Sequence, residues 1–82
     1  MVMLEPNTPP GYPPVVLLPW PQAVREYRRR RGMTQTELGA ELGIHWKTIS
    51  RFERGAYEPR PGSMFDKQLR ARLTLMGIEV EG

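Results

Sequence analysis

The sequence predicts a small all-α domain of four helices, with an extended arm before it and a short strand-like tail after it. Three observations carry this prediction. Apolar residues recur at helical spacing in four segments, glycines separate those segments, and seven of the nine prolines lie within the first 21 residues. The 82 residues contain no cysteine, so a compact apolar core must stabilise the domain without disulfides or a thiolate zinc site.

The proline-rich residues 1–19 are expected to form the extended arm. Proline lacks an amide donor and disfavours helix in the residue before it. Only the apolar run Val15–Leu18 is suited to pairing as a short strand. The alternative is an ordinary disordered terminus.

The domain itself is expected over residues 20–77. Pro21 suits the first turn of a helix and Gly32 its end, with Val24 and Tyr27 facing inward. Thr34-Gln35-Thr36-Glu37 fits a capping box at the start of the next helix, whose apolar stripe continues through Leu38 and Leu42. The four helices are expected at about 21–31, 35–42, 46–54 and 64–76.

The last two helices follow the same logic. Ile49 and Phe52 should face inward on the third helix, which Gly55 closes. Ser63 to Asp66 fits a second capping box, and one face of the fourth helix carries apolar residues at spacings of four, four and three. These are Phe65, Leu69, Leu73 and Met76. Gly77 stops that helix, and Ile78–Val80 alternates as a strand would within the tail, residues 78–82.

The segment from Thr34 to Gly55 carries the strongest functional indication. Two helices that cross steeply need a small residue where they meet, a glycine in the turn, and an aliphatic plug. Gly39, Gly43 and Ile49 meet these needs. Counted from Gln35 as position one, they stand at positions five, nine and fifteen. Such a turn presents the second helix to the DNA major groove, whose width admits a helix.

Charge supports a polyanion partner for the same region. The chain carries a net charge of +3, and residues 22–60 alone hold nine Lys or Arg against five acids. A solvated basic face is the alternative explanation. The longest apolar run has four residues, and no signal peptide is apparent, so we expect a cytoplasmic, nucleoid-associated protein with no membrane partner.

Residues 22–62 resemble the Xre family of regulators, the helix-turn-helix class that includes Cro and the phage repressors. The matching pieces are Arg28, Gly32-Met33-Thr34-Gln35, Glu37-Leu38, Leu42-Gly43-Ile44, Ile49-Ser50-Arg51, Glu53-Arg54-Gly55 and Pro59. The resemblance implies a compact lambda-repressor-like domain that binds double-stranded operator DNA as a homodimer, without a cofactor, and regulates transcription as a repressor.

The resemblance also implies roles for single residues. Base edges would be read from the third helix, and Lys47 or Arg51 could instead rest on phosphates. Arg28 and Glu53 match a family ion pair that joins the first helix to the third. The base-reading candidates are Trp46, Lys47, Arg51 and His45, and the phosphate-binding candidates are Thr34, Gln35, Arg54, Tyr57 and Arg60.

Three residues depart from the family pattern. His45 stands where serine or threonine usually caps the third helix, and histidine is a poorer cap. Trp46 is unusual at the first reading position. Gly39 replaces the commoner alanine, at a cost of about 1 kcal/mol in helix propensity.

An enzyme and an antitoxin are the two rival functions. One histidine, no cysteine and no clustered carboxylates leave little material for an enzyme or a metal site. The stronger rival is an antitoxin that binds a toxin protein through the proline-rich arm and represses its own operon. For the homodimer, the expected contacts are the fourth helix and Ile78–Val80, paired with Val15–Leu18 as a small strand exchange.

Overall fold

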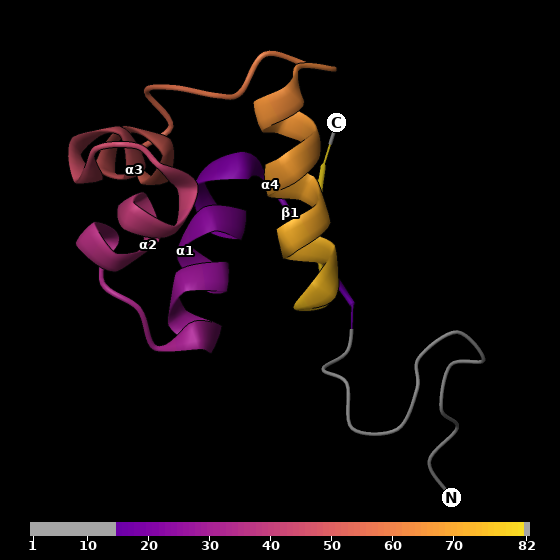
Figure 1. Ribbon diagram of the computed structural model, residues 1–82. Helices are drawn as coiled ribbons and strands as arrows, with labels where there is room; N and C mark the ends of the chain where they lie inside the picture. The colour runs from indigo at the N-terminus through magenta and orange to yellow at the C-terminus, as the bar shows by residue number, and fades with distance from the viewer. Residues whose placement is uncertain (1–14, 82) are drawn as a thin grey trace, which may run out of the picture.

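The computed structural model describes residues 15–81, which form four helices and two short strands (Figure 1). The expected all-α class, a compact four-helix domain with a strand at its C-terminal end, is confirmed. Most of the arm expected over residues 1–19 lies outside the described residues. The elements in order are β1 (Val16–Leu18), α1 (Trp20–Arg31), α2 (Gln35–Leu42), α3 (Trp46–Glu53), α4 (Met64–Leu75) and β2 (Ile78–Val80).

The helix ends lie within one residue of their expected positions. α1 begins at Trp20 instead of Pro21, because the carbonyl of Pro19 already accepts a hydrogen bond from the amide of Ala23 at 2.8 Å. Gly32 ends α1 in the left-handed conformation, with φ 63°. α3 ends at Glu53 and α4 at Leu75, each one residue earlier than expected.

The capping box of α2 is confirmed. The Thr34 hydroxyl accepts from the Glu37 amide at 3.1 Å, and the Glu37 carboxylate accepts from the Thr34 amide at 2.9 Å. The backbone hydrogen bond of Thr34 holds the pKa of Glu37 below its usual value. Gly43 then turns the chain with φ 72°, which only glycine adopts without strain. Local sequence therefore fixes where α2 begins and ends.

The second expected capping box, at the start of α4, is only half formed. The Ser63 hydroxyl accepts from the Asp66 amide at 3.1 Å, as expected. The Asp66 carboxylate does not return to Ser63. It accepts instead from the amide of Gly62 at 3.0 Å and from Nε of Arg70 at 2.9 Å. Asp66 thus joins the loop before α4 to the next turn of the helix.

β1 and β2 pair in parallel within the same chain, with Val16 opposite Ile78 and Leu18 opposite Val80. The expectation that these segments pair between two chains is therefore replaced by an internal sheet. Its inner face buries Ile78 and Val80, which join Leu69 and Leu73 of α4 in the core. Ile78 and Val80, expected at a dimer contact, are thus buried in the core of one chain, whereas Val15 and Leu17 stay exposed.

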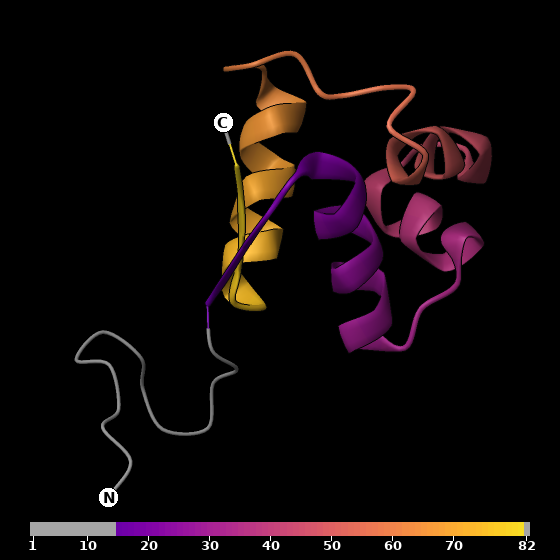
Figure 2. The ribbon, with the colours of Figure 1, turned by 180° about the vertical axis from the view of Figure 1, so that it is seen from behind.

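α1 lies at the centre of the domain and separates two groups of elements (Figures 1 and 2). α2 and α3 pack on one side of it, and α4 with the sheet packs on the other. The core runs through all of these elements, with Val24, Leu38, Ile49, Phe52 and Leu69 at most 1% exposed. No helix within residues 15–81 is long and apolar enough to cross a membrane.

Candidate nucleic-acid interface

α3 has one buried side and one exposed side. Ile49 and Phe52 are fully buried, whereas Trp46, Lys47 and Arg51 lie on the exposed side. This division follows from the helical period, because residues three and four apart share a face. The buried face fixes the helix against α1 and α2, so its exposed side chains are held on a rigid base.

The exposed side of α3 forms a shallow hollow of about 220 Å³. Four of the five residues around it carry a cation or an aromatic ring, and Ser50 contributes a hydroxyl. The hollow is lined by Trp46, Lys47, Ser50, Arg51 and Arg54. Trp46 is 43% exposed, and the Lys47 ammonium lies 6.0 Å from the centre of its ring. The fold thus brings three of the expected base-reading residues together with Arg54.

His45 caps α3 through its ring. Nδ1 accepts a hydrogen bond from the amide of Lys47 at 3.1 Å, and the ring lies 5.6 Å from that of Trp46. An imidazole nitrogen thus replaces the hydroxyl that usually caps this helix. His45 was expected to read bases, and the structure gives its Nδ1 a role in starting the helix.

Arg28 and Glu53 join α1 to the end of α3. Nε of Arg28 donates to Oε2 of Glu53 at 2.8 Å, and its terminal nitrogen donates to Oε1 at 3.0 Å. Glu53 is only 5% exposed, so its charge depends on these donors. The paired carboxylate raises the pKa of the Arg28 guanidinium. Nε2 of Gln35 also donates to Oε1 of Glu53, at 3.3 Å.

The expected phosphate-binding residues are distributed around α3. Gln35 is the first residue of α2 and reaches Glu53, while both the hydroxyl and the amide of Thr34 are used in the helix cap. Arg54 follows α3, with Nε 3.4 Å from the Ser50 carbonyl oxygen. Tyr57 is 49% exposed and packs its ring 5.1 Å from that of Phe52. Tyr57 and the exposed Arg60 do not line the hollow.

Ion pairing divides the cations of the domain into two groups. Arg29 and Arg30 pair with Glu26, Arg31 and Arg72 pair with Glu41, and Arg70 pairs with Asp66. On α3 and in the loop that follows it, by contrast, no carboxylate of residues 15–81 lies within salt-bridge distance of the cationic side chains. These are Lys47, Arg51, Arg54 and Arg60. Four cations without an ion-pair partner therefore lie on α3 and the loop after it, and within residues 15–81 Lys67 on α4 also has none.

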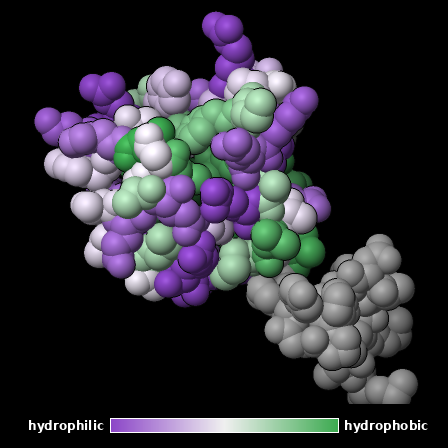
Figure 3. Space-filling model, viewed as in Figure 1, coloured by the Kyte–Doolittle hydropathy of each residue, from purple (hydrophilic) through white to green (hydrophobic). Residues whose placement is uncertain are grey.

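The space-filling view shows how hydrophilic and apolar side chains are distributed over one face of the domain (Figure 3). Hydrophilic side chains project from the end that carries α3, and apolar surface gathers beside the start of β1 and the end of α4. Exposed apolar residues there are Val15, Leu17 and Leu75, at 56%, 58% and 73%. The backbone of the start of β1 lies beside the end of α4, since the Val16 amide donates to the Gly77 carbonyl at 2.9 Å. The two ends of the domain thus differ in chemistry.

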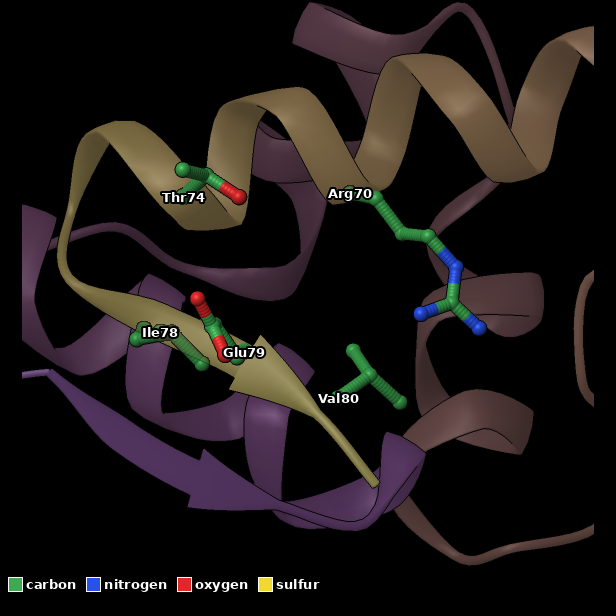
Figure 4. Close-up of a pocket in the computed structure, with 5 residues that line it drawn as sticks. All are labelled: Arg70, Thr74, Ile78, Glu79 and Val80. Atoms are coloured by element: carbon green, nitrogen blue, oxygen red, sulfur yellow. The ribbon is translucent and has the colours of Figure 1, made fainter. Parts of the chain in front are cut away.

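A second hollow, of about 210 Å³, lies between α4 and β2 (Figure 4). Arg70 and Thr74 line it from the helix, and Ile78, Glu79 and Val80 line it from the strand. The Arg70 guanidinium is already bound to Asp66 and lies 5.1 Å from the centre of the Trp20 ring. Within residues 15–81, no three His, Asp or Glu side chains gather as a metal site would require.

Sequence reasoning did not select Arg25 or Ser50. Arg25 lies one turn before Arg28 on α1, and its guanidinium donates to the carbonyl of Glu53 at 2.9 Å. Its spacing of three from Arg28 was the available signal, because residues three apart lie on one helix face. Ser50 lies one turn after Trp46 on the exposed side of α3 and could have been found in the same way.

Comparison with known proteins adds an independent finding. Residues 24–66 match the model of a family described as helix-turn-helix. The chain is 44% identical over 36 residues to an uncharacterized HTH-type transcriptional regulator of Archaeoglobus fulgidus, covering 44% of this chain and 51% of that protein. A protein of the same description from Methanothermobacter thermautotrophicus is 42% identical over 36 residues, 44% of this chain and 52% of its own length.

The family match, over residues 24–66, includes the whole of α3. The matched region spans about half the length of each of these curated relatives. No solved structure matches the chain.

Proposed function

This chain belongs to the helix-turn-helix family, and from that premise we propose that it is a sequence-specific, double-stranded-DNA-binding transcriptional regulator. One observation carries the proposal. Lys47, Arg51, Arg54 and Arg60, on α3 and the loop that follows it, have no carboxylate partner in residues 15–81, whereas Glu26, Glu41 and Asp66 pair with arginines of α1 and α4. A helix with a buried inner face and unpaired outer cations is suited to the major groove of DNA.

In this proposal α3 lies in the major groove, and its exposed residues make different contacts with the bases. Lys47 and Arg51 donate to the O6 and N7 acceptors of guanine, each contact giving about 1–3 kcal/mol of discrimination. The half-exposed Trp46 supplies apolar contact, for which the thymine methyl is the available partner in that groove. The hollow between Trp46 and Arg54 gives room for a base edge to approach.

Contacts with the sugar-phosphate backbone hold α3 in register. Gln35 lies at the start of α2, where free amides and the helix dipole favour an anion. Arg54, Tyr57 and Arg60 are exposed on the segment that follows α3 and extend the backbone contacts. Such contacts contribute affinity without sequence information.

The regulator acts as a repressor that binds a palindromic operator as a homodimer. One recognition helix covers only a few base pairs, and two of them must be about 34 Å apart to enter successive turns of one groove. The exposed Val15, Leu17 and Leu75, at the start of β1 and the end of α4, offer apolar surface outside α3. Contact through this surface leaves both copies of α3 free for DNA.

Footprinting on genomic DNA tests this function most directly. We expect protected sites with two-fold symmetry, half-sites about one helical turn apart, and binding that weakens steeply with salt as counterions are released. A reporter gene placed behind such a site should be expressed less when the protein is present. Absence of salt-dependent duplex binding would refute the function, and sedimentation of a monomer both free and on DNA would refute the dimer.

A second candidate, an antitoxin, draws on the apolar surface of Val15, Leu17 and Leu75. The same surface could contact a different protein, close to where the proline-rich residues 1–14 join the domain. A toxin-like reading frame directly beside this one would favour that function. In that case Leu75→Glu should abolish a complex with the neighbouring gene product and leave monomeric contacts with DNA intact.

A further inference from the structure

Arg25 occupies an unusual place between two helices. Its side chain is 58% exposed, yet one terminal nitrogen donates to the Glu53 carbonyl at 2.9 Å, and its Nε lies 3.9 Å from Oε1 of Glu53. We propose that Arg25 is a further phosphate-contacting residue, which acts beside Gln35 at the edge of α3. The inference rests on the proposed function, because it names an additional contact for the same interface.

Glu53 organises this part of the surface. Its carboxylate accepts two hydrogen bonds from Arg28 and one from Gln35, and Arg25 lies at the edge of salt-bridge distance. Two arginines around one carboxylate leave one positive charge uncompensated. The pairing of Arg28 with Glu53 therefore does not neutralise the cluster as a whole.

The free charge is more accessible on Arg25 than on Arg28. Arg28 is 26% exposed, and its guanidinium donates to both Glu53 oxygens and, at 3.2 Å, to the Met33 carbonyl. Arg25 makes one short hydrogen bond, so most of the five N–H donors of its guanidinium remain for another acceptor. A partly anchored arginine loses less conformational freedom when it binds a second anion.

The position of Arg25 matches that of a backbone contact. Arg25 and Gln35 lie within 3.9 Å of the same Oε1 atom of Glu53, so the exposed guanidinium is beside the start of α2, where a phosphate is expected. The start of α1 also touches the turn after α3, where a Cβ on Gly55 would lie 3.5 Å from Cγ of Pro21. Arg25 is thereby fixed relative to the helix that enters the groove.

A purely structural role makes a different prediction. A cation at the C-terminal end of a helix stabilises its last carbonyls, and Arg25 has that arrangement with α3. In that case its removal lowers the melting temperature but leaves the salt dependence of DNA binding unchanged. Salt dependence therefore distinguishes the two roles.

The test compares Arg25→Gln with Arg29→Gln in the full chain. Both arginines lie on α1 and are more than half exposed, and both changes remove one charge, but Arg29 pairs with Glu26 and does not contact α3. Affinity for an operator duplex and for a random duplex is measured from about 50 to about 200 mM salt. Arg25→Gln should lower the slope of log affinity against log salt by about 0.9 for each bound subunit and weaken both duplexes by the same factor per subunit. Arg29→Gln should leave the slope unchanged.

Two additional measurements secure the result. Arg25→Lys retains the charge and should restore most of the slope. In the wild-type protein, the Nε–H resonance of Arg25 should move when random duplex is added, and that of Arg29 should not, which requires no variant to fold.

The inference is overturned if both glutamine variants change the slope equally, or if Arg25→Gln melts lower with an unchanged slope and the Arg25 resonance does not move. Wild-type protein that bound no duplex at all would instead refute the proposed function.

Discussion

Gly39 and Ile44 meet at the tightest point of the helix-turn-helix. The Gly39 carbonyl accepts from the Ile44 amide at 2.8 Å, and a Cβ on Gly39 would lie only 2.6 Å from the Ile44 carbonyl oxygen. The same Cβ would lie 3.3 Å from the amide nitrogen of Trp46. Glycine is therefore required for this close approach of α2 to the start of α3.

We predict that Gly39→Ala destabilises the domain by about 1 kcal/mol. Alanine gains about 1 kcal/mol of helix propensity, but the added methyl group must displace backbone atoms, and such overpacking costs about 1–3 kcal/mol. Operator affinity should fall further than stability alone explains, because Trp46 shifts with the turn. Urea unfolding and DNA titration check this prediction. The control variant Ala40→Gly, at an exposed position of α2, measures how much helix propensity alone changes stability there. A more stable Gly39→Ala protein would contradict the prediction.

Removal of Arg28 should destabilise the fold strongly. Arg28→Met leaves the carboxylate of Glu53, 5% exposed, with Gln35 and the more distant Arg25 as its remaining partners. Breaking a buried ion pair on one side costs about 3–5 kcal/mol, and we expect the lower end. The double variant Arg28→Met with Glu53→Leu should recover part of the loss. Urea unfolding curves of the three proteins decide the matter, and equal losses in both variants would show that the stranded charge is unimportant.

Stability should decline in acid through Glu26. Hydrogen bonds from Arg29 and Arg30 lower the pKa of Glu26 from 4.5 to about 2. A carboxylate with a lowered pKa stabilises the folded state above its unfolded pKa, and this contribution disappears as pH falls from about 4.5 to about 2. Glu26→Gln should flatten the decline of unfolding free energy in that window. The variant that lacks both Arg29 and Arg30 should flatten it similarly, whereas an unchanged profile would show that the ion pairs do not persist in solution.

Arg51 and Gln35 should differ in how they affect DNA specificity. Arg51→Ala removes a proposed base contact, so affinity for the operator should fall by about 1–3 kcal/mol while affinity for random duplex falls much less. Gln35→Ala removes a proposed phosphate contact and should weaken both duplexes alike. Parallel titrations with the two DNAs measure the difference. If Arg51→Ala lowered the affinity for both DNAs equally, Arg51 would be a contact to the DNA sugar-phosphate backbone.

The sequence predicted the parts of the fold that local chemistry determines. The capping box of Thr34 and Glu37 and the left-handed turns at Gly32 and Gly43 depend on residues close in the chain, and each is present. The burial of Ile49 and Phe52 followed from helical period alone. These features need no knowledge of how distant segments pack.

Features that depend on distant partners were not predicted. Val16 and Ile78 pair within one chain, and sequence alone could not distinguish this from pairing between chains. Likewise, Glu41 pairs with Arg31 and Arg72, which lie in segments far apart in the sequence. The sequence alone therefore could not show which arginines have no ion-pair partner. By contrast, the half-formed capping box at Asp66 has a local cause, because the Ser63 amide already donates to the Arg60 carbonyl at 3.1 Å and the carboxylate accepts from Gly62 instead.

The parallel pairing of β1 with β2 has a consequence for protein synthesis. Val16 and Leu18 leave the ribosome among the first residues of the domain, but their partners Ile78 and Val80 are made only after all four helices. Until then the inner face of the sheet has no second strand, and the closing contact spans nearly the whole domain. The nascent domain therefore completes its core only after Val80 has left the ribosome, and ribosome stalling before that point would leave it open to proteases.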